Sequence, residues 1–194
     1  MITDASWGDV GVPGVAGRIA FILMDQVRSL RVGGTFDVLD GSPLLVDLET
    51  RKTQIMACEA LAPIMALCLC RHRLANKSIN FFIDNMSGLC ALAKGSSKKP
   101  DLSAMCFAFH LAANSIGVKP WIDYVQTSSN VADGGSRVGP TDALSAELGI
   151  KLVWIPTFHL PLGFATIDPP GWAAWWDTTA AWAADFEKNI RCVK

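Results

Sequence analysis

The sequence lacks several features that mark a membrane, secreted or zinc-binding protein. No apolar run reaches the roughly 18 uncharged residues that a membrane-spanning helix needs, because the longest, residues 55–70, contains Glu59 and Pro63. The first residues, MITDAS, carry no basic charge, so no secretory signal is expected there. There are only three histidines, and no two cysteines have the two-residue spacing of zinc or thioredoxin motifs, which argues against a structural zinc site.

A strong excess of positive charge is also missing. The net charge is −1, a weak electrostatic footprint for a protein that binds nucleic acid. The one basic cluster is KGSSKKP, which is either a solvated loop or a site of phosphate contacts through Lys94, Lys98 and Lys99. The six cysteines lie mostly in apolar segments. They are expected to be free thiols in a reducing, intracellular compartment, the cytoplasm or the nucleus.

What the sequence does contain is an alternation of apolar strand and helix patterns. Hydrophobic residues make up 51% of the chain, enough for one domain with a sizeable core. The order of patterns predicts an α/β fold with a five-stranded mixed sheet, its first three strands antiparallel, flanked by helices. Gly33 and Gly34 are interpreted as breaking the chain between the second and third strands. The expected strands are residues 2–6, 18–24, 44–49, 78–84 and 119–125, and the expected helices are 53–73, 86–95, 101–117 and 128–137.

Residues 141–194 differ from the rest of the chain. They are interrupted by prolines and end in an expected helix that is rich in aromatic rings. A lone surface helix cannot leave so many rings exposed, so this extension is expected to pack on the domain formed by residues 1–140 or on a partner. The rings belong to Trp172, Trp175, Trp176, Trp182 and Phe186.

Four acids fall where this arrangement of elements can bring them together. Asp4 lies in the first strand, Asp84 ends the fourth, Glu59 lies early in the long helix and Asp133 lies in the last short helix. Each alone has a structural explanation, such as a helix cap or an exposed position, and Glu49 is an alternative to Glu59. Together their charges repel unless divalent cations bind, and oxygen ligands select Mg²⁺ or Mn²⁺ over zinc.

Four segments together resemble the ribonuclease H domain of retroelements, of the type that follows reverse transcriptase in retrotransposon polyproteins. They are TDAS, ACEALA, FFIDNMSGLCALAKG and SNVADGGSR, and the resemblance covers residues 1–140. It implies a ribonuclease H-like fold and an endonuclease that hydrolyses the RNA strand of RNA–DNA hybrids with two Mg²⁺ ions, which Mn²⁺ can replace. It also implies an upstream reverse transcriptase domain as a partner, onto which the tryptophan-rich extension could dock.

The resemblance assigns a role to each acid. Asp4 is expected to bridge both metals, and Glu59 and Asp84 to complete the metal on the leaving-group side. Asp133 is expected to join Asp4 at the metal that activates the attacking water. Many ribonucleases H have a histidine shortly before the last acid, but here that loop reads YVQTSSNVAD and has none.

Substrate contacts are expected beside these acids. Selectivity for RNA would come from contacts to 2′-hydroxyl groups across the minor groove of the hybrid. Asn85 and Asn130, next to the matched acids, are the candidates for such contacts, and Lys94, Lys98 and Lys99 are candidates for binding the backbone.

Two other readings stay open. One is a different nuclease, or an integrase-like transferase, of the same fold, although an integrase would place a glutamate where this chain has Asp133. The other is a catalytically inactive domain of the same fold that serves as a scaffold or a connection.

Overall fold

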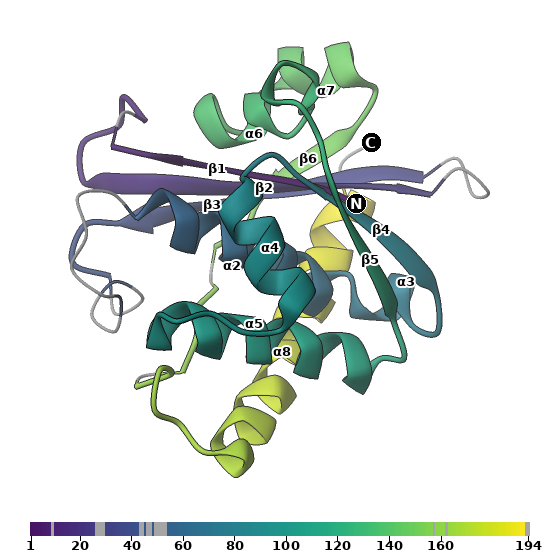
Figure 1. Cartoon of the computed structure of the whole chain (residues 1–194). Coiled ribbons are helices and arrows are strands. Elements are labelled where there is room, and N and C mark those ends of the chain that lie inside the picture. The colour runs from purple at the N-terminus through teal and green to yellow at the C-terminus, as the bar shows by residue number, and fades with distance from the viewer. Residues whose placement is uncertain are drawn as a thin grey trace.

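The computed structural model describes residues 1–8, 10–25, 30–42, 45, 48, 54–156, 158–161 and 163–192 (Figure 1). In this part of the chain the strands form a six-stranded mixed sheet of order β5-β4-β1-β2-β3-β6. The first three strands are antiparallel neighbours, as predicted, whereas β4 pairs parallel with β1 and with β5, and β6 pairs parallel with β3. The strands are β1 (Ile2–Trp7), β2 (Val15–Asp25), β3 (Leu30–Leu39), β4 (Ser78–Ile83), β5 (Lys119–Tyr124) and β6 (Lys151–Trp154).

The third strand was predicted in the wrong place. The structure forms β3 from Leu30–Leu39, and most of the predicted strand 44–49 lies outside the described residues. Gly33 and Gly34 do not break the chain but lie inside β3. A Cβ atom on Gly33 would approach a Leu152 methyl group to 2.5 Å, and one on Gly34 would approach the Phe21 ring to 2.8 Å. Glycine therefore serves here to let neighbouring side chains approach the strand closely.

The sixth strand comes from the C-terminal segment, so the predicted count of five was wrong. Residues Lys151–Trp154 pair in register with Val32–Thr35 of β3. This strand has only four residues and is followed by Pro156, and so short a pattern was not recognised as a strand. Residues 141–194 therefore contribute to the sheet itself.

Helices cover both faces of the sheet (Figure 1). The short α6 and α7 lie on one face, and α2, α4, α5 and α8 lie on the other. A brief 3₁₀ turn (Thr127–Ser129) precedes α6. The helices are α2 (Ile55–Leu69), α3 (Arg71–Leu74), α4 (Met86–Lys94), α5 (Pro100–Ser115), α6 (Asp133–Arg137), α7 (Asp142–Leu148) and α8 (Pro169–Cys192).

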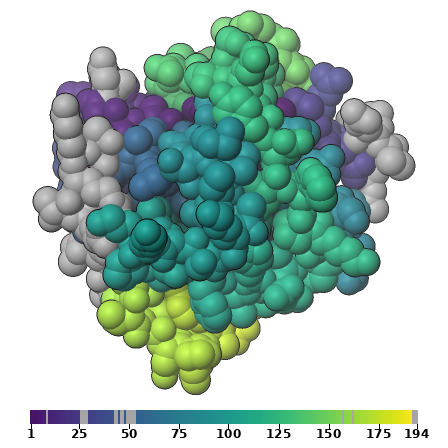
Figure 2. Space-filling view, viewed as in Figure 1, coloured from purple at the N-terminus to yellow at the C-terminus, as the bar shows by residue number. Residues whose placement is uncertain are grey.

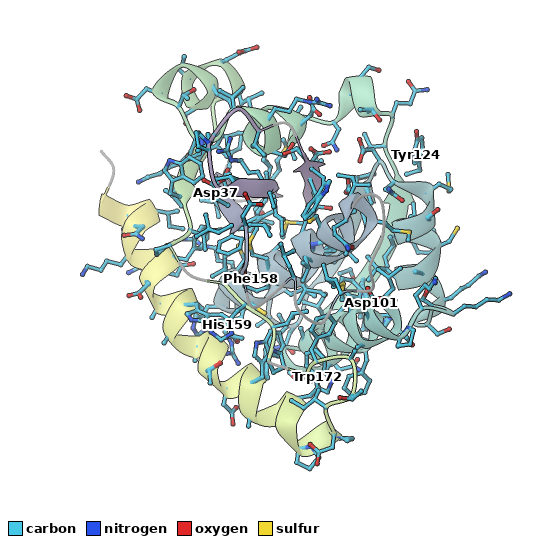
Figure 3. The ribbon with its side chains drawn as sticks, turned by 90° about the vertical axis from the view of Figure 1, so that its left-hand side faces the viewer. Asp37, Asp101, Tyr124, Phe158, His159 and Trp172 are labelled. Atoms are coloured by element: carbon cyan, nitrogen blue, oxygen red, sulfur yellow. The ribbon has the colours of Figure 1, made fainter. Side chains whose placement is uncertain are left out.

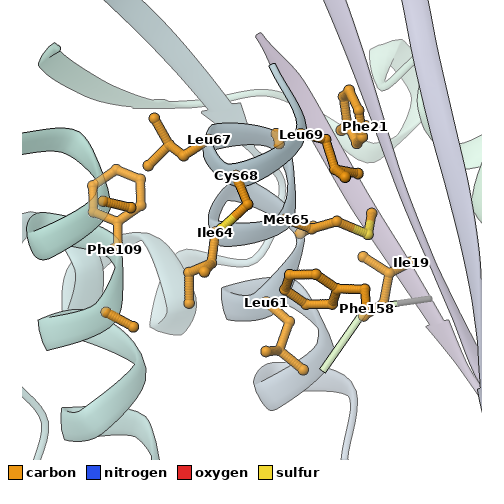
Figure 4. Close-up of a cluster of buried hydrophobic side chains, with 14 of the residues drawn as sticks. Ile19, Phe21, Leu61, Ile64, Met65, Leu67, Cys68, Leu69, Phe109 and Phe158 are labelled. Carbon is orange, nitrogen blue, oxygen red and sulfur yellow. The ribbon is translucent and has the colours of Figure 1, made fainter. Parts of the chain in front are cut away.

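Helix α2 is the centre of the main core. Every residue from Ala57 to Leu69 is buried, as expected for a helix that is apolar on all sides. In Figure 4, Met65 and Leu69 point toward the sheet residues Ile19 and Phe21, while Ile64 and Leu67 point toward Phe109 of α5. Glu59, one turn from the start of α2, is thereby placed in an almost dry environment.

Helix α8 packs along this core. Phe186 lies with its ring centroid 5.6 Å from that of Phe21, and Arg73 of α3 forms an ion pair with Glu187. Figure 2 shows the start of α8 directly against α5, and the rings of Phe107 and Trp172 lie 6.0 Å apart there. Four of the five aromatic side chains named for this segment are buried: Trp172, Trp175, Trp176 and Phe186.

The connection that leads into α8 is also packed against it. The Trp175 indole N–H donates to the carbonyl of His159 at 2.8 Å, and the His159 ring (labelled in Figure 3) lies 4.8 Å from that of Trp182.

None of the helices in the described part of the chain has the length and hydrophobicity of a membrane-spanning segment.

Candidate active site

Two neighbouring strands and one helix bring three acids together. The parallel pairing of β1 with β4 sets Ile2 opposite Phe82, so Asp4 and Asp84, each two residues further on, lie at the same level. Helix α2 supplies Glu59 from the face that it covers. One carboxylate oxygen from each of Asp4, Glu59 and Asp84 lies within 4.8 Å of the others. The predicted convergence of these three residues is therefore present in the fold.

Two of the three acids are buried, Asp84 is half-buried, and their charges repel one another. Asp4 is 2% exposed and Glu59 is 4% exposed. The pKa of Glu59 is raised to about 9, chiefly by burial and to a smaller extent by the nearby charges of Asp4 and Asp84. Burial also raises the pKa of Asp4 to about 7, although a hydrogen bond from Ser136 opposes the shift. A shared cation would offset both the burial and the mutual repulsion that keep these carboxyl groups protonated.

One atom of the cluster indicates what it is built to hold. Glu59 Oε2 is buried and has no hydrogen-bond partner among the described residues, while the Ala5 amide donates to the same side chain. A buried carboxylate oxygen without a partner is costly, and it is satisfied when a hard cation binds. The donor set consists of oxygen atoms alone, which fits Mg²⁺ or Mn²⁺ and not a structural zinc ion.

The carboxylate of Asp4 is held on both oxygens. Asn130 Nδ2 donates to Asp4 Oδ1 at 2.8 Å, and the Ser136 hydroxyl donates to Asp4 Oδ2. The second N–H of the Asn130 side chain donates to the carbonyl of Thr3. The side-chain oxygen of Asn130 accepts from the amide of Ala132. Asn130 is buried and both its N–H donors are used, so the predicted contact with substrate does not fit its position. It positions Asp4 instead.

Asp133 lies beside the cluster and not in it. Its carboxylate accepts from Arg137 Nε at 2.7 Å, one turn later in α6. Its charge is close enough to raise the pKa of both Asp4 and Glu59. The structure thus brings three of the four predicted acids within metal-binding reach, and it leaves the fourth paired with an exposed arginine.

The other predicted contacts lie at the two ends of α4. Asn85 caps α4, because its side-chain oxygen accepts from the amide of Gly88 at 3.0 Å. Lys94 ends α4, and Lys98 and Lys99 follow it as exposed residues before α5. Glu49, the alternative to Glu59, lies outside the described residues.

The sequence did not indicate one residue that contacts the acid cluster, Ser136, and one that supports α6 beside it, Arg18. Ser136 lies within the SNVADGGSR segment, but nothing in that segment alone shows that its hydroxyl reaches Asp4. Arg18 gives no signal in the sequence, since it is one basic residue in an apolar strand; it donates to the carbonyl of Arg137 at the end of α6. Both contacts depend on how α6 lies on the sheet.

Comparison with known proteins gives a result only at the level of structure. No protein-family model matches the chain, and no curated protein matches its sequence. Among solved structures, the N-terminal RNase H domain of rv2228c from Mycobacterium tuberculosis, solved as a fusion with maltose-binding protein, superposes with a TM-score of 0.52 at 15% identity. The match covers 76% of this chain and 96% of that one.

A second solved structure is RNase H1 from the halophilic archaeon Halobacterium salinarum NRC-1. It matches with a TM-score of 0.49 at 16% identity, over 68% of this chain and 87% of that one. At such low sequence identities the similarity applies to the fold alone. On the match to the mycobacterial domain, together with the sheet order and the helices on both faces, the chain has a ribonuclease H-like fold.

Proposed function

We propose that this chain is a metal-dependent endonuclease that hydrolyses the RNA strand of RNA–DNA hybrids. The observation that carries the proposal is the convergence of Asp4, Glu59 and Asp84 within 4.8 Å, with Asp4 and Glu59 buried and Glu59 Oε2 without a partner among the described residues. Three carboxylates this close, two of them buried, repel one another and lower stability, which is typical of a functional site. The ribonuclease H-like fold gives this cluster a chemical context.

Asp4, Glu59 and Asp84 would hold the metal, and Asp133 would join them as a fourth ligand. Two divalent ions held by these residues would supply an activated water and charge stabilisation for the leaving oxygen of a phosphodiester. The residues of the chain fix the ligands in advance. Asn130 and Ser136 orient Asp4, and the Ala5 amide orients Glu59, so these two ligands would need little rearrangement when the metal binds. Asp133 would have to exchange its contact with Arg137 for the metal.

The substrate would approach from the side of Asp84 and the start of α4. Asn85 follows Asp84 directly, and its amide nitrogen could donate to a 2′-hydroxyl group. The exposed Lys94, Lys98 and Lys99 would contact the backbone phosphates. Because the net charge is only −1, further affinity would come from a neighbouring domain, which the motif resemblance suggests is a reverse transcriptase of a retroelement polyprotein.

The test is cleavage of a labelled RNA–DNA hybrid in Mg²⁺, beside double-stranded DNA of the same sequence. We expect cleavage of the RNA strand by the wild type, loss of at least about 100-fold in rate for Asp84→Asn, and an unchanged rate for Asp185→Asn, a matched change at an exposed position of α8. Cleavage that persists in Asp84→Asn would overturn the assignment of the site. Binding of the hybrid with no cleavage would favour the inactive scaffold instead.

A further inference from the structure

The sheet face beneath α6 is organised in rows that run across four strands. The strand registers place Asp4, Ala20, Thr35 and Trp154 side by side, from β1 through β2 and β3 to β6. Residues directly opposite each other in paired strands share a face. An acid of the candidate site and a tryptophan of the C-terminal segment thus belong to one row.

Helix α6 lies unusually close to this row. A Cβ atom on Gly135 would stand 3.1 Å from the Ala20 methyl group, so the small residues on both sides permit the approach. At this short distance the Ser136 hydroxyl reaches Asp4, and the Ser6 hydroxyl donates to the carbonyl of Ser136 at 2.6 Å. The position of α6 therefore decides whether the second oxygen of Asp4, Oδ2, is held.

Arg18 joins the end of α6 to the sheet. It lies in the next row, between Ser6 and Asp37, and it is 2% exposed. Its Nε donates to Asp37 Oδ1 at 2.5 Å, and one terminal nitrogen donates to the carbonyl of Arg137 at 3.0 Å (Asp37 is labelled in Figure 3). A buried guanidinium is costly unless its donors are used, and here they connect β2, β3 and α6.

Trp154 covers this connection. The guanidinium carbon of Arg18 lies 4.9 Å from the centroid of the Trp154 ring, a cation–π contact. The ring also fits against Gly139, just after α6: a Cβ atom there would stand 2.8 Å from two ring carbons, and the φ of +83° favours glycine in any case. The end of α6 and the residues just after it are thus fixed by contacts that lead to β6.

We propose that Arg18 and Trp154 are positioning residues for the candidate site, and that the C-terminal segment thereby belongs to the catalytic unit. They hold the end of α6, α6 presents Ser136 to Asp4, and Asp4 stays in the orientation that binds the metal. Neither residue touches the cluster itself. The inference rests on the proposed function for the role of Asp4, and on the described contacts for the connection.

The experiment compares Trp154→Ala with Trp154→Phe and Trp121→Ala in the full chain. Trp121 is the matched control, because it lies on the opposite edge strand β5 and is more exposed than Trp154, at 67% against 46%. Three quantities are measured: Mn²⁺ affinity without substrate, from the electron paramagnetic resonance signal of the free ion; amide hydrogen exchange over residues 130–139; and kcat and KM on the hybrid.

For Trp154→Ala we expect Mn²⁺ affinity to weaken by about 3- to 10-fold, exchange over residues 130–139 to accelerate, and kcat to fall while KM stays unchanged. Trp154→Phe should keep all three quantities close to their wild-type values, because it retains an aromatic ring against the guanidinium of Arg18. Trp121→Ala should match the wild type. If Trp154→Ala does not fold, the experiment uses Asp37→Asn instead. This change weakens the ion pair with Arg18 at a partly exposed position. It should change Mn²⁺ affinity, exchange and kcat in the same directions but by less.

The outcomes separate this inference from the proposed function. Wild-type Mn²⁺ affinity and exchange in Trp154→Ala would overturn the positioning role, whatever the enzyme cleaves. An equal loss in Trp121→Ala would also overturn it, since the effect would then be general. A wild type that cleaves no hybrid overturns the proposed function alone, and exchange over residues 130–139 then decides whether Trp154 holds α6.

Discussion

Asn130 donates a hydrogen bond of 2.8 Å to Asp4, although the two residues are 126 positions apart in the chain. The bond joins the first strand to the segment that leads into α6, and both partners are buried. Asn130 also satisfies the carbonyl of Thr3 and the amide of Ala132, so one side chain serves three groups. It connects the stability of the fold with the geometry of the acid cluster.

Replacement of Asn130 by Ala should therefore destabilise the protein. The carboxylate of Asp4 and the Ala132 amide lose a buried partner, and the free energy of unfolding is expected to fall by about 1–3 kcal/mol. Urea denaturation in a chelating buffer measures it. The control is Asn114→Ala, at an exposed position of α5, where a change below about 0.5 kcal/mol is expected. Equal effects of the two changes would show that the contacts of Asn130 contribute nothing.

Without metal, Glu59 should make the protein less stable as the pH rises. The folded side chain keeps its proton up to about pH 9, whereas the unfolded one loses it above about 4.5, so the folded state binds more protons across this window and its stability falls with increasing pH. Glu59→Gln removes this effect. It should stabilise the metal-free protein by about 2–3 kcal/mol at pH 7 and have little effect at pH 4.

Thermal melting in a chelating buffer at both pH values tests this. Glu147→Gln, at an exposed position of α7, is the matched control and should leave both melting temperatures unchanged. A Glu59→Gln variant that is less stable than the wild type at pH 7 would contradict the expectation, because it would show that the ionised carboxylate stabilises the metal-free fold.

Metal affinity should depend on pH in the opposite sense. Protons on Asp4 and Glu59, with pKa values of about 7 and about 9, must leave before a cation binds. Mn²⁺ affinity is expected to rise between pH 6 and pH 8, by roughly tenfold per pH unit for each proton released. Isothermal titration calorimetry in two buffers of different ionisation enthalpy counts these protons. Affinity that is independent of pH, with no protons released, would place the ion elsewhere.

Helix α8 should be essential to the stability of the fold. Phe186 is buried against Phe21 of the sheet, and Phe186→Ala is expected to lower the free energy of unfolding by about 3–5 kcal/mol. The neighbouring exposed Asp185→Ala is the control and should change it by less than about 0.5 kcal/mol. If Phe186→Ala unfolds at the same urea concentration as the wild type, α8 is an appendage and not part of the core.

The sequence predicts those parts of the site that depend on local position. Asp84 follows an apolar strand, Asp4 lies in another strand and Glu59 lies early in a long helix, so a parallel pairing of the two strands is enough to bring them together. Helix α4 was predicted to within one residue, because Gly95 takes the left-handed conformation that ends it.

What the sequence does not predict depends on packing between distant segments. Gly33 and Gly34 look like a turn, and only the neighbouring Leu152 and Phe21 show why glycine is needed inside a strand. The role of Asn130 follows from its hydrogen bonds to β1, and that of Ser136 from the close approach of α6. No local pattern encodes distances of this kind, because each is set by the register of strands that are far apart in the chain.

The strand order also has a consequence for how the protein is made. Of the described strands, β1 is synthesised first and lies inside the sheet, while the two edge strands, β5 and β6, are synthesised last. The sheet therefore grows outward, and each new strand covers an edge that was open before. A nascent chain that stalls before Lys151 leaves the glycine-containing edge of β3 open to other chains, and such open edges promote aggregation.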